Sequence, residues 1–242
     1  MQNKEIKSHI QRYYKDLFEN RQPHRLPIAT GKKLAESLGY PTDQLQFVTH
    51  EYWQYFLPCG NPIPLFTPKT GDRVLNLGCG AAIDSFVMAS QHMDLIQVLN
   101  VDTVCSVLQR ASLQADSASL GHMLSWVCGD GESLPFHERY FDWVLMNGSF
   151  NLFPEKSIVL QEIWRVLKPL GVLLGADLCA ASTLPDYFRE EKDAWAWCMS
   201  GACTQEALMQ LFESHRFKLT NLIREEESED MLYRVVFCCQ KS

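Results

Sequence analysis

The sequence has no long hydrophobic run and no cluster of basic residues, and each absence excludes a class of protein. No segment approaches the roughly 20 apolar residues that span a bilayer, and residues 1–7 are polar, unlike a secretion signal. Lys and Arg number 22 against 29 Asp and Glu, giving a net charge of −7 that disfavours phosphate-rich partners. We therefore expect a cytoplasmic protein that binds neither membranes nor nucleic acid.

Metal-binding motifs are also missing, whereas cysteine is plentiful. No paired-His helix and no His/Cys cluster with ligand spacing occurs, so no catalytic metal is expected. The chain has nine cysteines, which in a reducing cytoplasm should mostly be thiols. Most of them are expected to be small buried side chains, and the neighbours Cys238 and Cys239 should face opposite sides of a strand.

Length and patterning predict one sizeable core with a small attached cap. The 242 residues, 46% apolar and 21% charged, are ordinary for a globular enzyme. Residues 1–68 read as a helical cap, because apolar residues recur at helical spacing within 6–17 and 34–38. The proline-rich segment 57–64 then forms a rigid loop that leads into a second domain, 69–242.

From Asp72 onward, short apolar runs alternate with helical patterns. Alternation of this kind predicts βαβ units and a mostly parallel sheet with helices on both faces. We expect a Rossmann-like, doubly wound α/β fold with seven strands and a C-terminal antiparallel hairpin. The expected strands are 73–77, 97–102, 125–129, 141–146 and 171–176, and the expected helices are 83–91, 104–115 and 155–167.

The C-terminal part breaks this alternation. Its acidic segment 225–230 is the expected turn of the hairpin, which adds an antiparallel strand at one sheet edge. The other elements expected here are a helix over 182–197 within a possible lid insertion at 181–204, a helix from the N-cap Thr204 to Ser214, and strands over 217–223 and 232–239.

The first expected strand ends in a glycine turn, Gly78-Cys79-Gly80, before a helix. Glycine allows the backbone to turn sharply and to approach a ligand closely. Asp102 closes the next strand, about 20 residues on, where a carboxylate can accept both hydroxyls of a ribose. An ordinary βα turn and a helix-capping Asp remain the alternatives for these two features.

Two later strands end in polar residues at the same predicted sheet edge. Asp130 and Gly131 follow the third strand, where a carboxylate can accept the amino group of an adenine. Asn147 ends the fourth strand, beside the same cleft. In open α/β sheets, ligands bind at this carboxyl edge.

In this order, the segments between 72 and 177 resemble the class I S-adenosylmethionine-dependent methyltransferases. The resemblance implies S-adenosylmethionine as cofactor, with the glycine turn near its methionine part, Asp102 at the ribose and Asp130 near adenine. A dehydrogenase is less well supported, because Ala81 and Ala82 replace the glycine that opens the helix in its fingerprint. The implied cofactor-binding residues are Tyr14, Asn76, Gly78, Cys79, Gly80, Asp102, Asp130, Gly131 and Asn147.

Two positions depart from the methyltransferase pattern. Asn76 stands where Asp or Glu is usual, and Ala82 stands where a third glycine is usual. A hydrogen bond to a charged group contributes about 1.5–3 kcal/mol, against about 0.5–1.5 kcal/mol for a neutral one. Weakened binding of the cofactor's ammonium group is therefore expected.

Three segments resemble the arsenite methyltransferases in particular: residues 55–62, 147–152 and, more roughly, 198–202. That family holds trivalent arsenic with cysteine thiolates, and soft sulfur ligands suit such a centre. The resemblance implies Cys59 and Cys198 as catalytic, arsenic-holding residues.

A third family cysteine is missing, because Gly148 occupies its position. Cys179 and Cys203 are possible substitutes. The expected function is thus methylation of a small molecule such as arsenite or a thiol. An oxygen or carbon acceptor would require a base, for which His50 and Glu51 are the candidates.

A catalytically silent binding or scaffold protein with the same fold is the alternative function. A set of aromatic residues is expected either to form a lid over the site or simply to pack the cap onto the core: Tyr13, Tyr14, Tyr55, Trp195 and Trp197. The oligomeric state stays open.

Overall fold

The computed structural model describes residues 2–19, 30–225 and 230–242. Positions 226–229 of the expected acidic turn lie outside the described residues.

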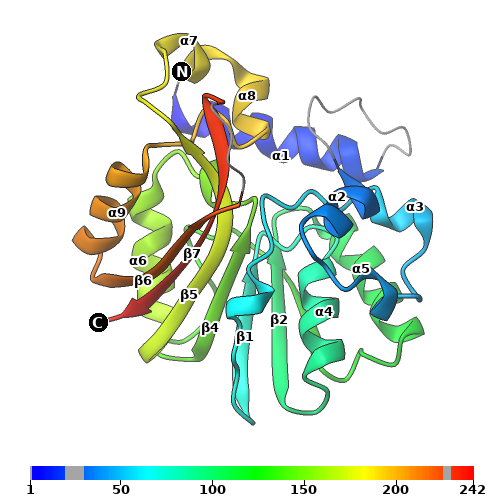
Figure 1. Cartoon of the computed structure of the whole chain (residues 1–242). Coiled ribbons are helices and arrows are strands. Elements are labelled where there is room, and N and C mark those ends of the chain that lie inside the picture. The colour runs from blue at the N-terminus through cyan, green and yellow to red at the C-terminus, as the bar shows by residue number, and fades with distance from the viewer. Residues whose placement is uncertain (1, 20–29, 226–229) are drawn as a thin grey trace.

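A mixed seven-stranded sheet crosses the molecule, with helices on both sides (Figure 1). The strand order is β3-β2-β1-β4-β5-β7-β6. The strands are β1 (Asp72–Leu77), β2 (Ile96–Asp102), β3 (Leu124–Cys128), β4 (Phe141–Asn147), β5 (Leu167–Ala180), β6 (Phe217–Arg224) and β7 (Leu232–Lys241).

Strands β1 to β5 are parallel to one another, and β7 runs antiparallel to both β5 and β6. The predicted Rossmann-like α/β class and the C-terminal hairpin are therefore confirmed. The antiparallel strand does not lie at the edge, however, because β7 inserts between β5 and β6. Cys238 and Cys239 do face opposite sides of β7 and belong to different packed clusters.

The helices also follow the predicted positions, with one exception. The helix predicted over 182–197 is two short helices, because the backbone is extended at Glu191. This bend lets Trp195 pack against Ile6 and Ile10, while Tyr187 stays exposed. The helices are α1 (Asn3–Glu19), α2 (Gly31–Ser37), α3 (His50–Trp53), α4 (Ile83–Gln91), α5 (Cys105–Ser117), α6 (Lys156–Val166), α7 (Asp186–Glu190), α8 (Lys192–Ala196) and α9 (Gln205–Ser214). Thr204 caps α9 as predicted, by accepting a hydrogen bond from the amide of Ala207.

Apolar side chains of the strands alternate between two buried clusters, one on each face of the sheet. Val74 packs in the cluster that contains Phe86 of α4, and Leu75 packs in the cluster that contains Ile163 of α6. Burial on both faces is what a sheet covered by helices requires. Trp53, from the expected N-terminal cap, belongs to the α4 cluster, so the cap shares its core with the sheet.

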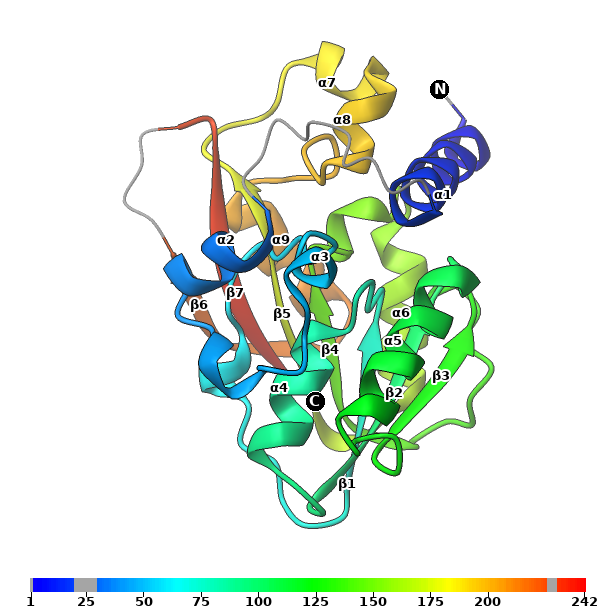
Figure 2. The same ribbon diagram turned by 90° about the vertical axis from the view of Figure 1, so that its right-hand side faces the viewer.

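Helix α1 crosses the top of the molecule beside α8 (Figures 1 and 2). Of the described helices, none is both long and apolar enough to cross a membrane. Seven of the nine cysteines are thiols, and Cys105 and Cys128 form a disulfide that the sequence did not predict.

Candidate active site

A cavity of about 830 Å³ opens at the carboxyl ends of β1, β2 and β4, with α1 along one wall. All nine residues expected to contact the cofactor line it. Small-molecule sites commonly enclose about 300–1,000 Å³ and combine apolar walls with a few polar groups. The residues that we expected to contact the cofactor therefore lie around a single cavity. Their hydrogen bonds indicate the structural role of each.

The glycine turn is held in a conformation that favours glycine. Gly78 and Gly80 have φ of 71° and 49°, in the left-handed region. A Cβ on Gly78 would lie 2.5 Å from the Cβ of Ser149, so a side chain does not fit there. Ala82 also has a left-handed φ of 56° and thus adopts the backbone that a third glycine would take.

Asp102 lines the cavity and also accepts hydrogen bonds from nearby backbone amides. Its Oδ2 accepts a hydrogen bond from the amide of Gly80 at 2.9 Å, and its Oδ1 accepts one from the amide of Val104 at 2.9 Å. The residue therefore links the glycine turn to the start of α5. A carboxylate has about four acceptor positions, so capacity for a ligand remains.

Asp130 connects the loop after β3 to α1. Its carboxylate lies 2.7 Å from the ammonium of Lys7, which also lies 2.7 Å from Glu132. The adjacent Gly131 packs closely, since a Cβ there would lie 2.7 Å from the ring of Phe153. This pairing holds the N-terminal helix at the edge of the cavity.

Sequence reasoning missed Asp84, a buried carboxylate that lines the same cavity. It accepts hydrogen bonds from the Tyr40 hydroxyl at 2.6 Å and from Nδ2 of Asn147 at 3.3 Å. Burial raises the pKa of Asp84 to about 6. The available signal was an acidic residue in the first turn of the helix that follows the glycine turn.

Asn76, by contrast, takes part in the internal packing. Its amide donates a hydrogen bond to Ser85 at 2.8 Å, and Ser85 donates to Asn100. The negative charge absent at position 76 is thus present in the same cavity at Asp84.

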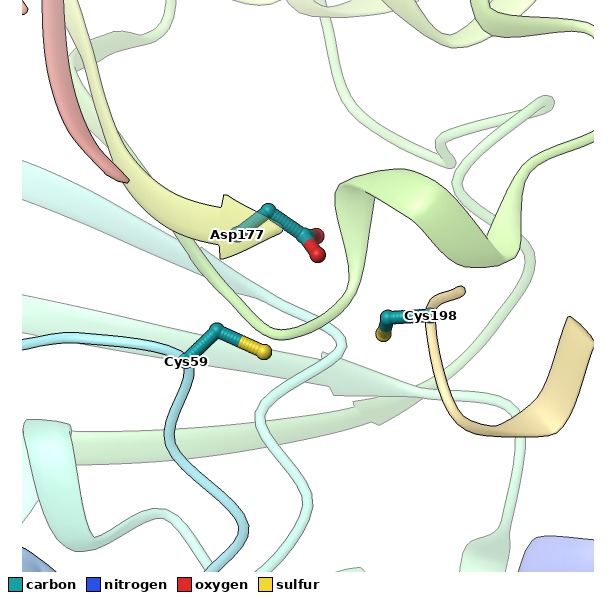
Figure 3. Close-up of side chains that lie close together, drawn as sticks. All are labelled: Cys59, Asp177 and Cys198. Atoms are coloured by element: carbon teal, nitrogen blue, oxygen red, sulfur yellow. The ribbon is translucent and has the colours of Figure 1, made fainter. Parts of the chain in front are cut away.

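Cys59 and Cys198 lie together, and Asp177 joins them. The two sulfur atoms and a carboxylate oxygen of Asp177 all lie within 4.8 Å of one another. Figure 3 shows the three side chains converging from the loop before β1, from β5 and from the turn after α8. Sequence reasoning named the two cysteines and missed the aspartate, whose position depends on how β5 meets two distant loops.

A second cavity, of about 20 Å³, adjoins the two cysteines. That volume exceeds the roughly 10–15 Å³ needed to hold one water molecule. Tyr14, Leu57 and Gly148 line both cavities. A group bound at the cysteines would therefore lie next to a ligand in the larger cavity.

Neighbouring groups fix the cysteines in place. The amide of Cys59 donates to Oδ1 of Asn147 at 2.9 Å, and the thiol of Cys198 donates to the carbonyl of Gly148 at 3.1 Å. The hydrogen bond with Cys59, burial and the charge of Asp177 raise the pKa of Cys198.

Asp177 is itself held by three donors: the amide and side chain of Asn151 and the amide of Leu178. Burial raises its pKa to about 6. These donors orient the carboxylate of Asp177, which lies beside the two sulfur atoms.

Gly148 occupies the position of the missing third cysteine. A Cβ there would lie 3.3 Å from the sulfur of Cys59, so a side chain at 148 would point at the cysteine pair. The suggested substitutes do not fill this place. Among the described residues, Asp177 is the third member of the cluster, and neither Cys179 nor Cys203 belongs to it.

The aromatic residues expected either to form a lid or to pack the cap onto the core include two tyrosines of α1 that contact α8 and the residue after it. The Tyr14 hydroxyl donates to the carbonyl of Ala196 at 2.8 Å, and the indole of Trp197 donates to the Tyr13 hydroxyl at 2.9 Å. Tyr55 instead packs against Phe18. The proposed bases His50 and Glu51 are exposed and line neither cavity.

A family model described as a methyltransferase domain matches residues 68–216. The chain belongs to this family. The match spans the glycine turn and the strand ends that line the large cavity, and the family implies S-adenosylmethionine as the cofactor. The residues present fit that group, because a buried carboxylate, Asp84, and a strand-end carboxylate, Asp102, line a cavity of suitable size.

Individual relatives include methyltransferases that act on different substrates. An arsenite methyltransferase of Halobacterium salinarum is 27% identical over 82% of this chain and 50% of its own length. A 2-phytyl-1,4-naphtoquinone methyltransferase of Synechococcus elongatus is 31% identical over 52% of each chain.

The crystal structure of an arsenic(III) S-adenosylmethionine methyltransferase from Chlamydomonas reinhardtii has a similar fold. It gives a TM-score of 0.69 at 25% identity, covering 84% of this chain and 72% of that one. This chain spans about half the length of the curated relatives that it matches.

Proposed function

We propose that this methyltransferase moves the methyl group of S-adenosylmethionine to a trivalent arsenic centre held by Cys59 and Cys198. The observation that carries the proposal is the convergence of two cysteine sulfurs beside the cofactor cavity. Thiolates are the preferred ligands of soft centres. We further propose that the protein acts on small molecules in the cytoplasm, with no nucleic-acid partner.

The residues of the large cavity would each hold one part of the cofactor. We assign Asp84 to the ammonium group, the backbone of the glycine turn to the methionine part, Asp102 to the ribose and the loop at Asp130 to adenine. The bound cofactor supplies an electrophilic methyl group on a sulfonium sulfur. A charged partner for the ammonium offsets the loss of charge at Asn76.

The buried pair of cysteines would position the acceptor. Arsenite arrives with hydroxyl groups, so each thiol that replaces one releases its proton with that hydroxyl as water. Two As–S bonds then hold the arsenic, with its lone pair available to the methyl group. Correct placement of the reacting atoms and exclusion of water are the main contributions that such a site makes.

The test is turnover of S-adenosylmethionine by reduced, purified chain with arsenite and a dithiol, followed by mass spectrometry of methylated arsenic. We expect arsenite-dependent product, and a loss of at least about 100-fold in Cys59→Ser and Cys198→Ser, because the hydroxyl is a poor ligand for arsenic. Cys238→Ser, on β7 away from both cavities, is the matched control. Cofactor binding without any arsenite-dependent turnover contradicts the proposal.

The alternative is a chain that binds the cofactor and acts on a different acceptor or on none. Gly148 favours this alternative, since one of the family's cysteines is absent. The quinone methyltransferase relative shows that related chains methylate organic acceptors. A panel of small thiols and quinols in the same assay separates another acceptor from a silent scaffold.

A further inference from the structure

We propose that Cys105 and Cys128 form a reversible thiol–disulfide site that sets how tightly the chain binds its cofactor. The inference rests on the cofactor part of the proposed function and is independent of the acceptor. The two residues are joined as a disulfide, with their Cα atoms 5.3 Å apart, while the other seven cysteines are thiols. In reducing compartments, disulfides are usually transient and either catalytic or redox-sensing.

The disulfide joins the two segments assigned to the adenosine part of the cofactor. Cys105 is the first residue of α5, soon after Asp102, and Cys128 is the last residue of β3, just before Asp130. In the sheet, Asp102 pairs with Cys128, and Cys128 itself lines the cofactor cavity. The bond therefore adds a covalent link between two walls of the cavity that the sheet already places side by side.

Cys105 and Cys128 are both exposed residues, so we expect a reductant to reach the bond between them. Cys105 also begins a helix of 13 residues, and the partial positive charge at a helix N-terminus stabilises a thiolate. Cys105 is thus the better leaving group, so a reducing thiolate is expected to attack the sulfur of Cys128.

Reduction of the disulfide requires two electrons and two protons, which a dithiol supplies as co-reactant. Attack on Cys128 forms a mixed disulfide and releases the thiolate of Cys105. The second thiol of the reductant then displaces Cys128 and closes the reductant's own disulfide. Two electrons pass to the pair, each cysteine ends as a thiol, and the reverse exchange with an oxidised dithiol restores the bond.

Loss of the bond should weaken cofactor binding without abolishing it. The two segments gain freedom that cofactor binding must then remove, and this ordering costs affinity. Other contacts persist, among them the hydrogen bond from the amide of Gly129 to the carbonyl of Asp102 at 3.0 Å and the Lys7–Asp130 ion pair. We therefore expect the dissociation constant to rise about 3- to 10-fold on reduction.

The experiment is calorimetric titration of the whole chain with S-adenosylmethionine, without acceptor, after oxidation by a small disulfide and again after reduction by a dithiol. Alkylation and mass spectrometry should count seven free thiols in the first state and nine in the second. The double variant Cys105→Ser/Cys128→Ser should bind like the reduced chain in both states. Cys238→Ser should respond to reduction as the unchanged chain does.

Equal affinity in the two states, tighter binding after reduction, or nine free thiols after oxidation would each overturn the proposal. Absence of binding in both states would overturn it together with the proposed cofactor. Failure of arsenite methylation alone leaves these titrations unaffected, so the two proposals fail separately. Thermal unfolding of the double variant checks that it is folded.

Discussion

At the scale of single residues, the site depends on carboxylates that the fold has removed from water. Asp84 and Asp177 are both buried, and burial raises the pKa of each to about 6. A buried carboxylate persists only with hydrogen-bond partners, and both residues have them. Asp84 also lines the large cavity, and raised pKa values at a cavity are typical of functional sites.

Asp84 should make cofactor binding dependent on pH. Its neutral form is favoured in the folded chain, so its ionisation costs folding free energy as pH rises from about 4 through about 6. The ionised form is the one that pairs with an ammonium group. S-adenosylmethionine affinity, measured by calorimetry, should therefore fall as pH drops through about 6.

Asp84→Asn should weaken cofactor binding about 10-fold or more and remove this pH dependence, because a charged hydrogen bond becomes a neutral one. Asp94→Asn, at an exposed position, should leave the cofactor affinity and its pH dependence unchanged. Unchanged affinity in Asp84→Asn would show that the ammonium group binds elsewhere.

Ala82 should be a strained residue. A left-handed conformation costs a residue with a Cβ about 1–2 kcal/mol relative to glycine, and the buried methyl group returns about 0.8 kcal/mol through packing. Ala82→Gly is thus expected to raise the free energy of unfolding by about 0.5 kcal/mol and to preserve cofactor binding. Urea denaturation measures the change, and a destabilised variant would mean that packing of the methyl group outweighs the strain.

At the scale of elements, α1 and α8 act together as one wall of the site. Trp195 of α8 packs on Ile6 and Ile10 of α1, and the Tyr14 hydroxyl holds the carbonyl of Ala196. The turn that carries Cys198 follows directly, so a shift of α1 would also move the sulfur that we propose to hold the acceptor.

Tyr14→Phe removes the hydrogen bond and keeps the ring. A net contribution of about 0.5–1.5 kcal/mol predicts a 2- to 12-fold rise in the KM for the acceptor, with a smaller change in cofactor affinity. Steady-state kinetics and calorimetry separate the two effects. Tyr187→Phe, in exposed α7, is the control, and a loss confined to cofactor affinity would contradict this role for Tyr14.

At the scale of the whole molecule, local patterns were enough to predict the fold. Apolar runs such as 73–77, glycines at φ values that only they adopt readily, and the N-cap Thr204 each specify structure within a few residues. The prediction of one continuous helix over 182–197 was wrong. The segment bends at Glu191 and packs against α1, which is far away in the sequence.

The candidate site was also predictable only in part. Residues that follow a strand could be placed at the sheet edge from topology alone, and all of them line the cavity. Asp177 and the Cys105–Cys128 pair could not be foreseen, because only tertiary packing brings each to its partner. The resemblance to arsenite methyltransferases identified Cys59 and Cys198, which local patterns would have assigned to the core.

If the acceptor binds at the cysteine pair as we propose, the walls shared by the two cavities imply that acceptor and cofactor do not bind independently. Tyr14, Leu57 and Gly148 border both spaces, so a ligand that displaces Tyr14 in one space changes the shape of the other. Thermodynamic linkage then requires reciprocity: the factor by which the proposed acceptor changes the cofactor's dissociation constant must equal the factor by which the cofactor changes that of the acceptor. A chain built in this way would show cooperativity between unlike ligands within a single subunit.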